Sequence, residues 1–344
     1  MTAPVLVAMS GGVDSSVAAA LLVEAGHDVT GVTLKLWGGE SDSGCCSVGD
    51  VEDARRVAAQ LDIPHYVFNF VEEFDVNVIG PYADAYASGR TPNPCVECNR
   101  SMKFGRLLDR ADALGFDAVA TGHHARRRGS EGSYRLVRGA DSAKDQSYVL
   151  YMLGQRELAR ALLPVGELTK AEVRAHAAGL GLRTAAKPES MDVCFISRDE
   201  GREDFLASRV AARPGVVVDT AGGVIGRHDG ITRFTVGQRR GLGVATGERR
   251  YVVDVDAATA TVTVGARVDL LRDDVQVEGL SFVAGAPPPA DHDLLVQVRA
   301  HGLPVAGSLD GHVVRFADPQ PRVAPGQVVA LYDGDTLLGG GIAA

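Results

Sequence analysis

The stretch PVLVAMSGGVDSSVAAALLVEAG, residues 4–26, decides the fold of this chain. It begins with an apolar run suited to a buried strand, passes through a turn with two glycines, and ends in a run suited to a helix. The turn SGGVDSS spans Ser10–Ser16. Glycines let a backbone approach phosphate oxygens without a Cβ clash, and a helix N-terminus offers unpaired N–H groups to an anion. The stretch therefore predicts a strand, a phosphate-binding loop and a helix.

Three polar side chains of this turn have different candidate roles. Ser10 and Ser15 add hydroxyl donors for a phosphate. Asp14 cannot attract a phosphate, so we interpret it as a ligand of the magnesium ion that accompanies a nucleotide. The plainer alternative is an ordinary strand-to-helix turn capped by serine or aspartate. The turn lacks the Gly-Lys-Ser/Thr of a Walker loop.

Strand and helix patterns alternate through the first third of the chain, which predicts a parallel sheet with helices on both faces. Predicted strands at 29–36 and 65–70 flank a predicted helix at 51–62, whose apolar residues recur at helical spacing. A further helix over 101–115 precedes a strand at 117–122. These segments build one α/β domain.

From about residue 205 the pattern changes to short strands with glycine and aspartate turns. A chain of 344 residues is too long for one ordinary core, so two or three domains are expected. The proline-rich segment 284–293 is predicted to connect two strands. We therefore predict an α/β fold with a doubly wound parallel-sheet domain over 1–203, a small central β module over 204–278 and a β-barrel-like domain over 279–344.

The composition, with 45% hydrophobic and 23% charged residues, is typical of a soluble globular protein. No apolar run approaches the roughly 20 residues that span a bilayer, and the first residues lack the basic region of a secretory signal. We expect a cytoplasmic protein with no membrane partner. The net charge of −9 argues against a general nucleic-acid coat protein but allows a local basic surface. Basic clusters occur at 123–128, 233–240 and 247–250, and solvated loops are the plainer interpretation of each.

Two of the five cysteines, Cys95 and Cys98, lie close together between a pair of prolines and a basic stretch. In a reducing compartment such a pair is more often metal-binding or catalytic than a structural bridge. Cys194 lies in an apolar segment, where a buried structural thiol is the plainer interpretation. A zinc site is a further alternative, which would need Cys45 or Cys46 as an additional ligand.

Several motifs follow one another in an order that resembles a known family. They are AMSGGVDSSVAAALL (8–22), GRTPNPCVECNRSMKFG (89–105), DAVATGHHAR (117–126), KDQSYVLYML (144–153), ESMDVCFI (189–196), FTVGQRRGLG (234–243) and GGGIA (339–343). The first motif resembles the PP-loop of ATP pyrophosphatases. The whole set resembles the bacterial tRNA-specific 2-thiouridylases over essentially the entire chain, and the combination is highly specific.

The resemblance implies an enzyme that replaces the 2-oxygen of the wobble uridine with sulfur in the lysine, glutamate and glutamine tRNAs. ATP would transfer AMP to that oxygen and release pyrophosphate. A uridine carbonyl is a poor electrophile, and attached AMP makes its displacement by sulfur feasible. A cysteine persulfide can deliver the sulfur and a second thiol can cleave its S–S bond, so two cysteines are the minimum. The implied sulfur donor is a cysteine desulfurase or a sulfur-relay protein.

The family pattern assigns roles to the residues at matching positions. Cys98 corresponds to the nucleophile and Cys194 to the persulfide carrier, and the pair could close as a disulfide after turnover. The implied nucleotide contacts are Ala8, Met9, Ser10, Gly11, Gly12, Val13, Asp14, Ser15, Leu34 and Gly122. The target base, turned out of its stack, is implied to contact Asn93, Pro94 and Cys95. Other implied tRNA contacts are His123, Lys144, Asp145, Gln146, Arg299 and Gln327.

Two positions depart from the family pattern. Cys95 stands where a well-known version has an aspartate suited to acid–base work, and a thiol, with a pKa of about 8.5, does not simply take over that role. Cys95, Cys98 and Cys194 are therefore candidate ligands of a [4Fe–4S] cluster whose open iron holds the incoming sulfide, and the extra cysteine favours this route over the persulfide route. Ala300 stands where the pattern has an aromatic residue that would stack on a base.

Two other functions are compatible with parts of the sequence. Another PP-loop enzyme, such as an amidotransferase that adenylates a small metabolite, explains Ser10–Ser16 but gives no role to the cysteines, the basic clusters or the rear β modules. A non-catalytic RNA-binding or nucleotide-sensing protein is the second alternative.

Overall fold

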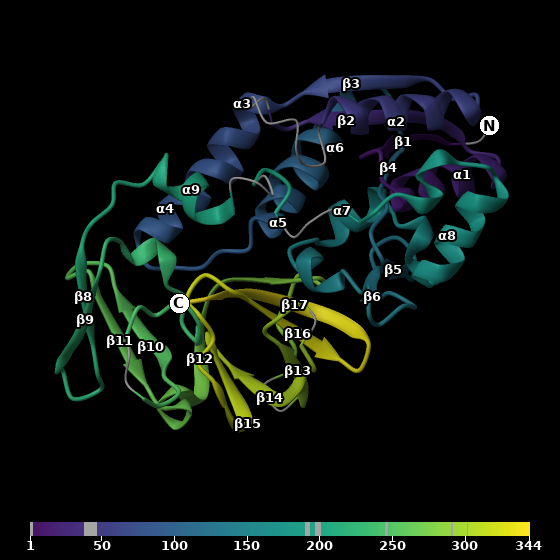
Figure 1. The fold of residues 1–344 in the computed structure, drawn as a ribbon. Helices are drawn as coiled ribbons and strands as arrows, with labels where there is room; N and C mark the ends of the chain where they lie inside the picture. Colours follow the sequence, from purple (N-terminus) through teal and green to yellow (C-terminus); the bar gives the residue numbers. More distant parts are fainter. Residues whose placement is uncertain are drawn as a thin grey trace.

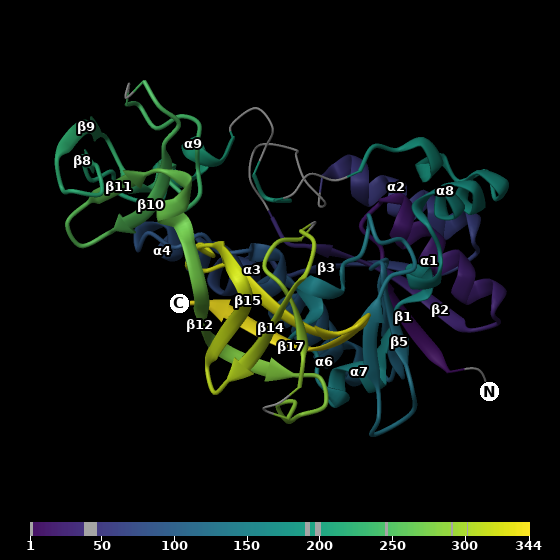
Figure 2. The same cartoon turned by 90° about the horizontal axis from the view of Figure 1, so that it is seen from below.

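The computed structural model describes residues 3–37, 47–189, 193–196, 201–244, 247–289, 292–300 and 302–344. An α/β domain comes first, and mostly β-structure follows (Figure 1). The central β module and the N-terminus lie at opposite ends of the molecule in both views (Figures 1 and 2). Cys45 and Cys46, the additional ligands considered for zinc, lie outside the described residues.

The N-terminal sheet is parallel throughout, with the strand order β3-β2-β1-β4-β7. Its strands are β1 (Pro4–Ala8), β2 (Asp28–Lys35), β3 (His65–Asn69), β4 (Ala118–Ala120) and β7 (Ala161–Leu162). Successive side chains of a strand point to opposite faces. Accordingly Val5 and Val7 join one buried cluster, whereas Leu6 joins another. The predicted doubly wound parallel sheet is therefore confirmed.

Helices cover both faces of this sheet. In chain order the helices of the domain are α1 (Val13–Glu24), α2 (Val48–Gln60), α3 (Val71–Phe74), η1 (Asp75–Ile79), α4 (Gly80–Ala87), α5 (Pro94–Glu97), η2 (Cys98–Arg106), α6 (Leu107–Ala113), η3 (Ser147–Leu150), α7 (Gln155–Arg160), η4 (Pro164–Glu167), α8 (Lys170–Gly179), η5 (Arg183–Ala186) and α9 (Gly201–Ala207). Of these, α4 and α9 lie toward the central module instead (Figure 1). The helix predicted at 51–62 begins earlier because the hydroxyl of Ser47 accepts the backbone N–H of Asp50 at 3.0 Å and caps α2.

The central module is a four-stranded sheet with the order β10-β11-β8-β9. Its elements are β8 (Gly215–Val218), β9 (Val224–His228), η6 (Ile231–Arg233), β10 (Tyr251–Asp256), β11 (Thr261–Gly265) and η7 (Arg267–Leu270). Val217, Val252, Val262 and Val264 are fully buried and belong to a cluster of this module's own. The module therefore has a small core separate from that of the α/β domain.

The C-terminal part is a closed antiparallel barrel, which confirms the predicted barrel-like fold. Its strands are β12 (Leu271–Phe282), β13 (Leu294–Gln297), β14 (Val305–Asp310), β15 (Val313–Pro321), β16 (Val328–Asp333) and β17 (Thr336–Ala343). Pairing of β12 with both β15 and β17 closes the circle. A hairpin from the α/β domain, β5 (Ala125–Arg128) and β6 (Arg135–Arg138), extends the sheet through β17, where Leu136 faces Leu337.

The strand pairing bears on where the domains divide. The boundary predicted at 278 falls inside β12, and the whole of β12 pairs with barrel strands. We propose that the barrel domain begins at about Leu271. The proline-rich connector lies between β12 and β13, as predicted for a strand connection. Among the described residues, no helix is long and apolar enough to span a membrane.

Candidate functional site

The two candidate nucleotide-binding segments meet where the strand order of the parallel sheet reverses. β2 and β3 lie on one side of β1, and β4 lies on the other. The loop Met9–Gly12 leaves the carboxyl end of β1, and Gly122 follows β4. Crevices at such reversal points are the usual ligand sites of open α/β sheets. The fold therefore brings the PP-loop and Gly122 to one place.

Two glycines of this site have no room for a side chain. Gly11 has a φ of +71°, and a Cβ on it would lie 2.2 Å from the carbonyl oxygen of Asp50. A Cβ on Gly122 would lie 2.7 Å from the backbone nitrogen of Ser15. The predicted glycines are thus required by close backbone packing around the start of α1.

Serines stabilise the loop internally. The Ser10 N–H donates to Ser15 Oγ at 3.2 Å, and the two hydroxyls lie 3.3 Å apart. Ser15 Oγ in turn donates to the carbonyl of Gly12 at 3.1 Å. Gly12, the N-cap of α1, provides no side-chain cap, so the first N–H groups of α1 keep their capacity to bind an anion. Met9, Val13 and Leu34 are buried beside the loop, and Ala8 ends β1.

Asp14 is held by two basic side chains that the sequence analysis did not single out. Lys170 Nζ donates to both carboxylate oxygens of Asp14, at 2.7 and 2.8 Å, and His124 Nε2 lies 3.2 Å from Oδ1. Burial raises the pKa of Asp14, but these hydrogen bonds and the charge of Lys170 outweigh it and lower the pKa below its ordinary value. Asp14 is therefore an ionised carboxylate paired with a lysine.

One sequence signal points to Lys170. Thr169 and Glu172 form a capping box that starts α8, so Lys170 occupies the first helical position. A cation is unfavourable at a helix N-terminus because it meets the positive end of the helix dipole. Its retention there is explained by Asp14 and by Glu189, whose carboxylate lies 3.4 Å from Nζ.

A second lysine fixes the loop from the opposite side. Lys187 Nζ donates to the carbonyl oxygen of Gly11 at 3.0 Å and to the carboxylates of Asp50 and Asp53 at 2.6 and 2.7 Å. Burial lowers the pKa of Lys187, but the hydrogen bonds to Asp50 and Asp53 raise it above its ordinary value. Lys187 therefore ties the PP-loop to α2.

The cysteine loop begins at a short capped helix. Asn93 Oδ1 accepts the backbone N–H of Cys95 at 3.0 Å and caps α5, in which Pro94 is the first residue. Cys98 is buried at the start of η2, a wide π-type turn. Such turns occur frequently at functional sites. Cys95 is half-buried, so the loop presents one cysteine at its surface and keeps the other inside.

Cys194 is held in place by its neighbour in the sequence. Phe195 is 4% exposed, and its ring centroid lies 5.8 Å from that of Phe74, 5.3 Å from that of Tyr82 and 5.2 Å from that of Phe205. Cys194 itself packs against the apolar cluster that contains Cys98. The two predicted sulfur-handling cysteines therefore share one cluster.

Tyr82 connects the two cysteine segments. Its ring packs edge-on to Phe195, and burial, the neighbouring Tyr86 and the proximity of Cys95 raise its pKa. Tyr82 therefore interacts electrostatically with Cys95 and packs against the residue after Cys194. The sequence of α4 gives no signal for this tyrosine, because its pattern does not distinguish Tyr82 from an ordinary core residue.

The three cysteines do not form a metal site in the described part of the chain. Over those residues, no group of three or more His, Cys, Asp or Glu side chains is placed to hold a metal ion. A [4Fe–4S] cluster with three protein thiolates needs such a group. The arrangement described here therefore does not fit the cluster.

Two of the predicted tRNA contacts are buried. His123 is 7% exposed with its Nδ1 2.7 Å from Thr121 Oγ1, and burial together with the charge of Lys103 holds its pKa well below the ordinary range. Asp145 is 8% exposed and accepts hydrogen bonds from Arg138, from the backbone N–H of Gly139 and from Ser147. The side chains of His123 and Asp145 are therefore buried and hydrogen-bonded within the protein.

The neighbours of Asp145 are more accessible. Gln146 is exposed and its Oε1 accepts the backbone N–H of His124 at 2.9 Å. Lys144, which is half-buried, pairs with Glu189 at 2.7 Å. The segment therefore borders the Lys170 network through Glu189, which also contacts Lys170.

The two predicted contacts from the barrel differ in their surroundings. Arg299 is exposed on the loop after β13. Gln327 is half-buried just before β16, and its Nε2 donates to the carbonyl oxygen of Thr91. The structure thus brings Gln327 to the cysteine loop.

Comparison with known proteins agrees with this geometry. Three family models match in succession: "tRNA methyl transferase HUP domain" over 3–198, "tRNA methyl transferase PRC-barrel domain" over 203–266, and "Aminomethyltransferase beta-barrel domain" over 272–343. The chain is 51% identical over 370 residues to a protein of Roseiflexus sp. (strain RS-1) named tRNA-specific 2-thiouridylase MnmA, covering 98% of each. The chain belongs to the tRNA-specific 2-thiouridylase family.

Other members of this family give the same result. A protein of the same name from Mycolicibacterium paratuberculosis is 49% identical over 352 residues, covering 97% of both chains. Among solved structures, a 4-thiouridine synthetase–RNA complex with bound ATP is 19% identical with a TM-score of 0.37, covering 56% of this chain and 44% of that chain. The U34-tRNA thiolase NcsA from Methanococcus maripaludis is 17% identical with a TM-score of 0.37, covering 60% and 64%. Likenesses this weak carry no argument about function.

Proposed function

We propose that this chain is a tRNA uridine 2-sulfurtransferase, which uses ATP to replace the 2-oxygen of a tRNA uridine with sulfur. The observation that carries the proposal is the 51% identity, over 98% of each chain, to a protein named tRNA-specific 2-thiouridylase. The PP-loop at the reversal point of the sheet and the cysteine loop in the same domain support it. We further propose the wobble uridine of lysine, glutamate and glutamine tRNAs as the acceptor, and a cysteine desulfurase or sulfur-relay protein as the sulfur donor.

The first step is adenylation. The 2-oxygen of the uridine attacks the α-phosphorus of ATP, the bond to the β-phosphate breaks, and pyrophosphate leaves. The candidate residues are those from Ala8 to Ser15 together with Leu34 and Gly122, which surround the N-terminus of α1. That N-terminus and Lys170 are the groups suited to the negative charge of the pyrophosphate.

Magnesium fits this site only if Lys170 moves. Asp14 is the residue of the loop that would hold the ion, and both its oxygens contact Lys170. When bound, magnesium neutralises phosphate charge. If Asp14 held the metal, the Lys170 ammonium would lose its contacts to that carboxylate, and it would be left to Glu189, 3.4 Å away, and to the phosphates of the bound nucleotide. We propose that Lys170 passes from Asp14 to the pyrophosphate during binding of ATP.

The second step is sulfur transfer. A persulfide on Cys194 attacks C2 of the adenylated uridine, and AMP leaves with its oxygen. The Cys98 thiolate then attacks Sγ of Cys194, which leaves the sulfur on the nucleoside and joins Cys98 to Cys194 in a disulfide. A dithiol reductant restores the two thiols before the donor reloads Cys194. Cys98 is buried in an apolar cluster, and the half-buried Cys194 packs against the same cluster, which supports this pairing.

Asn93, Pro94 and Cys95 are the candidates for holding the target base. The capped start of α5 gives this loop a fixed backbone, and Tyr82 lies beside it. His123, Lys144, Asp145, Gln146, Arg299 and Gln327 are the further candidates for tRNA contact. Because the side chains of His123 and Asp145 are buried, their contribution is to position the neighbouring backbone and side chains.

One assay separates this function from the two alternatives. Purified protein is incubated with ATP and an unmodified lysine tRNA transcript, and AMP release is measured with and without the RNA. We expect AMP release that depends on tRNA, and 2-thiouridine by mass spectrometry once a sulfur donor is added. AMP release that needs a small metabolite in place of tRNA would indicate an amidotransferase. Binding of tRNA without any AMP release would indicate a non-catalytic RNA-binding protein.

A further inference from the structure

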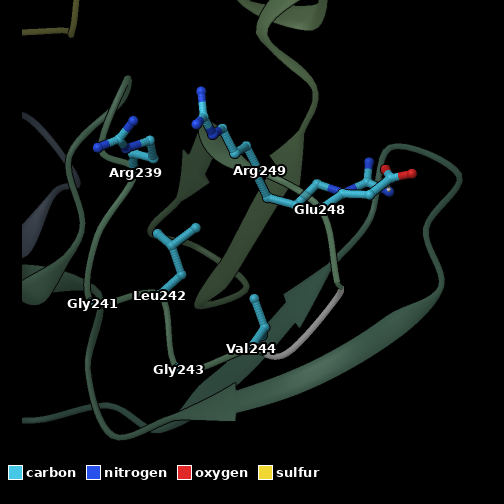
Figure 3. Close-up of a pocket in the computed structure, with 8 residues that line it drawn as sticks. Arg239, Gly241, Leu242, Gly243, Val244, Glu248 and Arg249 are labelled. Atoms are coloured by element: carbon cyan, nitrogen blue, oxygen red, sulfur yellow. Dashed lines mark hydrogen bonds and ion pairs between the residues drawn. The ribbon is translucent and has the colours of Figure 1, made fainter.

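Two basic clusters that are separate in the sequence come together at one cavity of the central module. The cavity has a volume of about 520 Å³ and is lined by Arg239, Gly241, Leu242, Gly243, Val244, Glu248, Arg249 and Arg250. In Figure 3 the guanidinium groups of Arg239 and Arg249 lie on the same side of the hollow, above Leu242 and Val244. The folding of the segment between β9 and β10 therefore creates a basic cavity that neither cluster forms alone.

The charges at this cavity are unbalanced. Of the described residues that line it, three are arginines and one, Glu248, is acidic, and Glu248 pairs with Arg250 at 3.3 Å. The chain as a whole carries a net charge of −9, so this concentration of positive charge is local. In addition, Arg250 Nε is buried and has no hydrogen-bond partner among the described residues. Such a group is unusual in a folded protein, and an acceptor brought by a bound ligand would satisfy it.

The cavity also has an apolar part. Leu242 is 8% exposed and Val244 is half-buried over Gly226, where a Cβ would lie 2.6 Å from a methyl carbon of Val244. A volume of this size is typical of sites for small organic molecules, which lie at about 300–1,000 Å³, and exceeds what a lone phosphate fills. Guanidinium groups above an apolar wall suit a nucleotide, because its phosphate pairs with arginine and its sugar or base covers apolar surface.

The chain connects this cavity to the cysteine loop. Thr235, four residues before Arg239, contacts Thr91 through their hydroxyls at 3.3 Å. Thr91 lies two residues before Asn93, the first candidate contact of the target base. Because four residues span at most about 14 Å, a nucleic acid bound at the cysteine loop is an anion within reach of these arginines.

We propose that this cavity binds a nucleotide of the substrate tRNA outside the modified position, with a backbone phosphate on Arg239, Arg249 and Arg250. The proposal rests on the proposed function, since it takes tRNA as the substrate. The cavity is an anchoring site that sets affinity, and it takes no part in the chemistry at the PP-loop or the cysteines.

The test uses the full chain and a lysine tRNA transcript. Affinity is measured over a series of salt concentrations for Arg239→Gln and Arg249→Gln. Each variant should bind tRNA more weakly and lower the slope of log K against log salt by about one unit, because one phosphate contact is lost. Glu248→Gln, which removes the negative charge and keeps the size of the side chain, should bind tRNA more tightly. At saturating tRNA, the thiolation rate of all three should stay within about twofold of the wild type.

Arg227→Gln is the matched control, because Arg227 is an exposed arginine on β9 that does not line the cavity. Equal salt slopes for Arg227→Gln and the cavity variants would overturn the proposal. A second outcome would indicate a small-anion site instead. In it, inorganic phosphate stabilises the wild type against unfolding but not Arg249→Gln, and the salt slope for tRNA binding is the same in both proteins. If the cavity variants instead received sulfur from the donor protein more slowly, with the salt slope for tRNA binding unchanged, the cavity would be a docking site for the donor protein. Failure of the wild type to make 2-thiouridine would contradict the proposed function alone, because these binding measurements do not depend on the chemistry.

Discussion

The side-chain amide of Gln327 donates a hydrogen bond to the carbonyl oxygen of Thr91. The Thr91 N–H donates to the carbonyl of Pro325 at 2.6 Å, and the Thr91 hydroxyl donates to that of Thr235 at 3.3 Å. The barrel and the central module therefore both hold the same residue of the α/β domain. This contact lies just before Asn93, so the position of the cysteine loop depends on all three parts of the chain.

Gln327→Ala should slow thiolation more than it weakens tRNA binding. Loss of this hydrogen bond removes about 0.5–1.5 kcal/mol from the placement of the loop, which corresponds to a rate roughly 2- to 12-fold lower at saturating tRNA. Arg299→Gln, at an exposed position of the barrel, is the comparison and should weaken binding with little change in rate. The measurement is single-turnover thiolation beside tRNA titration. A Gln327→Ala protein that loses only affinity would show that Gln327 acts as a direct RNA contact.

Asp14→Ala and Ser10→Ala should abolish thiolation and leave tRNA affinity nearly intact. The loop handles magnesium and pyrophosphate, and none of the predicted RNA contacts lies within it. AMP release and tRNA binding are measured in parallel, with Asp28→Ala at the exposed start of β2 as the control. Wild-type thiolation by Asp14→Ala would refute the PP-loop assignment.

Lys170→Met should weaken the binding of ATP and pyrophosphate but not that of AMP. AMP lacks the β- and γ-phosphates that the released ammonium is proposed to meet, whereas a purely structural role would affect all three ligands. Lys170→Arg, which keeps the charge, should recover part of the loss, and Lys35→Met, at an exposed strand end, should behave as the wild type. Calorimetric titration with each nucleotide makes the comparison. Equal losses for AMP and ATP would contradict the exchange between Asp14 and the phosphates.

His123 predicts a pH dependence of stability. Its pKa in the folded protein lies well below the ordinary value of 6.5 because the ring is buried. As the pH falls through about 6.5, the unfolded chain takes up a proton at this residue and the folded protein does not, so the free energy of unfolding decreases towards acid pH. His123→Gln should remove this part of the slope, at most about 1.4 kcal/mol per pH unit for one proton. Urea unfolding at pH 5, 6 and 7 measures it. Parallel pH profiles for the two proteins would show that His123 takes up a proton in the folded state.

The parts of this molecule that depend on neighbours in the sequence could be predicted from it. The strand, loop and helix of residues 4–26 are local, because the apolar runs, the glycines and the helix start all lie within one segment. The sequence predicts Gly11 as a loop residue, and the family resemblance implies Gly122 as a nucleotide contact at the end of a strand, but neither names the atoms that exclude a Cβ there, in Asp50 and Ser15. Pattern alone indicates that a glycine is needed, and only the fold gives the reason.

The parts that depend on contacts between residues far apart in the sequence could not be predicted from it. Lys170 and Asp14 are 156 positions apart, and Gln327 and Thr91 are 236 positions apart. The predicted domain boundary at 278 falls inside β12, whose pairing partners β15 and β17 follow it by dozens of residues. The three cysteines were grouped by motif, and their fit to a metal depends on side-chain positions that spacing does not give.

The cysteines lead to the last prediction. Cys98→Ser and Cys194→Ser should each eliminate 2-thiouridine but leave tRNA-dependent AMP formation detectable, because adenylation precedes sulfur transfer and requires neither thiol. AMP is measured by chromatography and 2-thiouridine by mass spectrometry of the digested tRNA. A Cys98→Ser or Cys194→Ser protein that still forms 2-thiouridine would show that the sulfur travels by another path.

Cys95 then separates the persulfide route from the cluster route. On the persulfide route Cys95→Asp introduces the residue common in the family pattern at this position, so activity should survive. On the cluster route the same change removes one of three ligands, so bound iron and activity should fall together. The described residues hold no three-ligand group, and we therefore expect Cys95→Asp purified without oxygen to be active and free of iron, like the wild type. The cluster route would be established instead if the wild type purified without oxygen contained iron, and if Cys95→Asp lost both the iron and the thiolation activity.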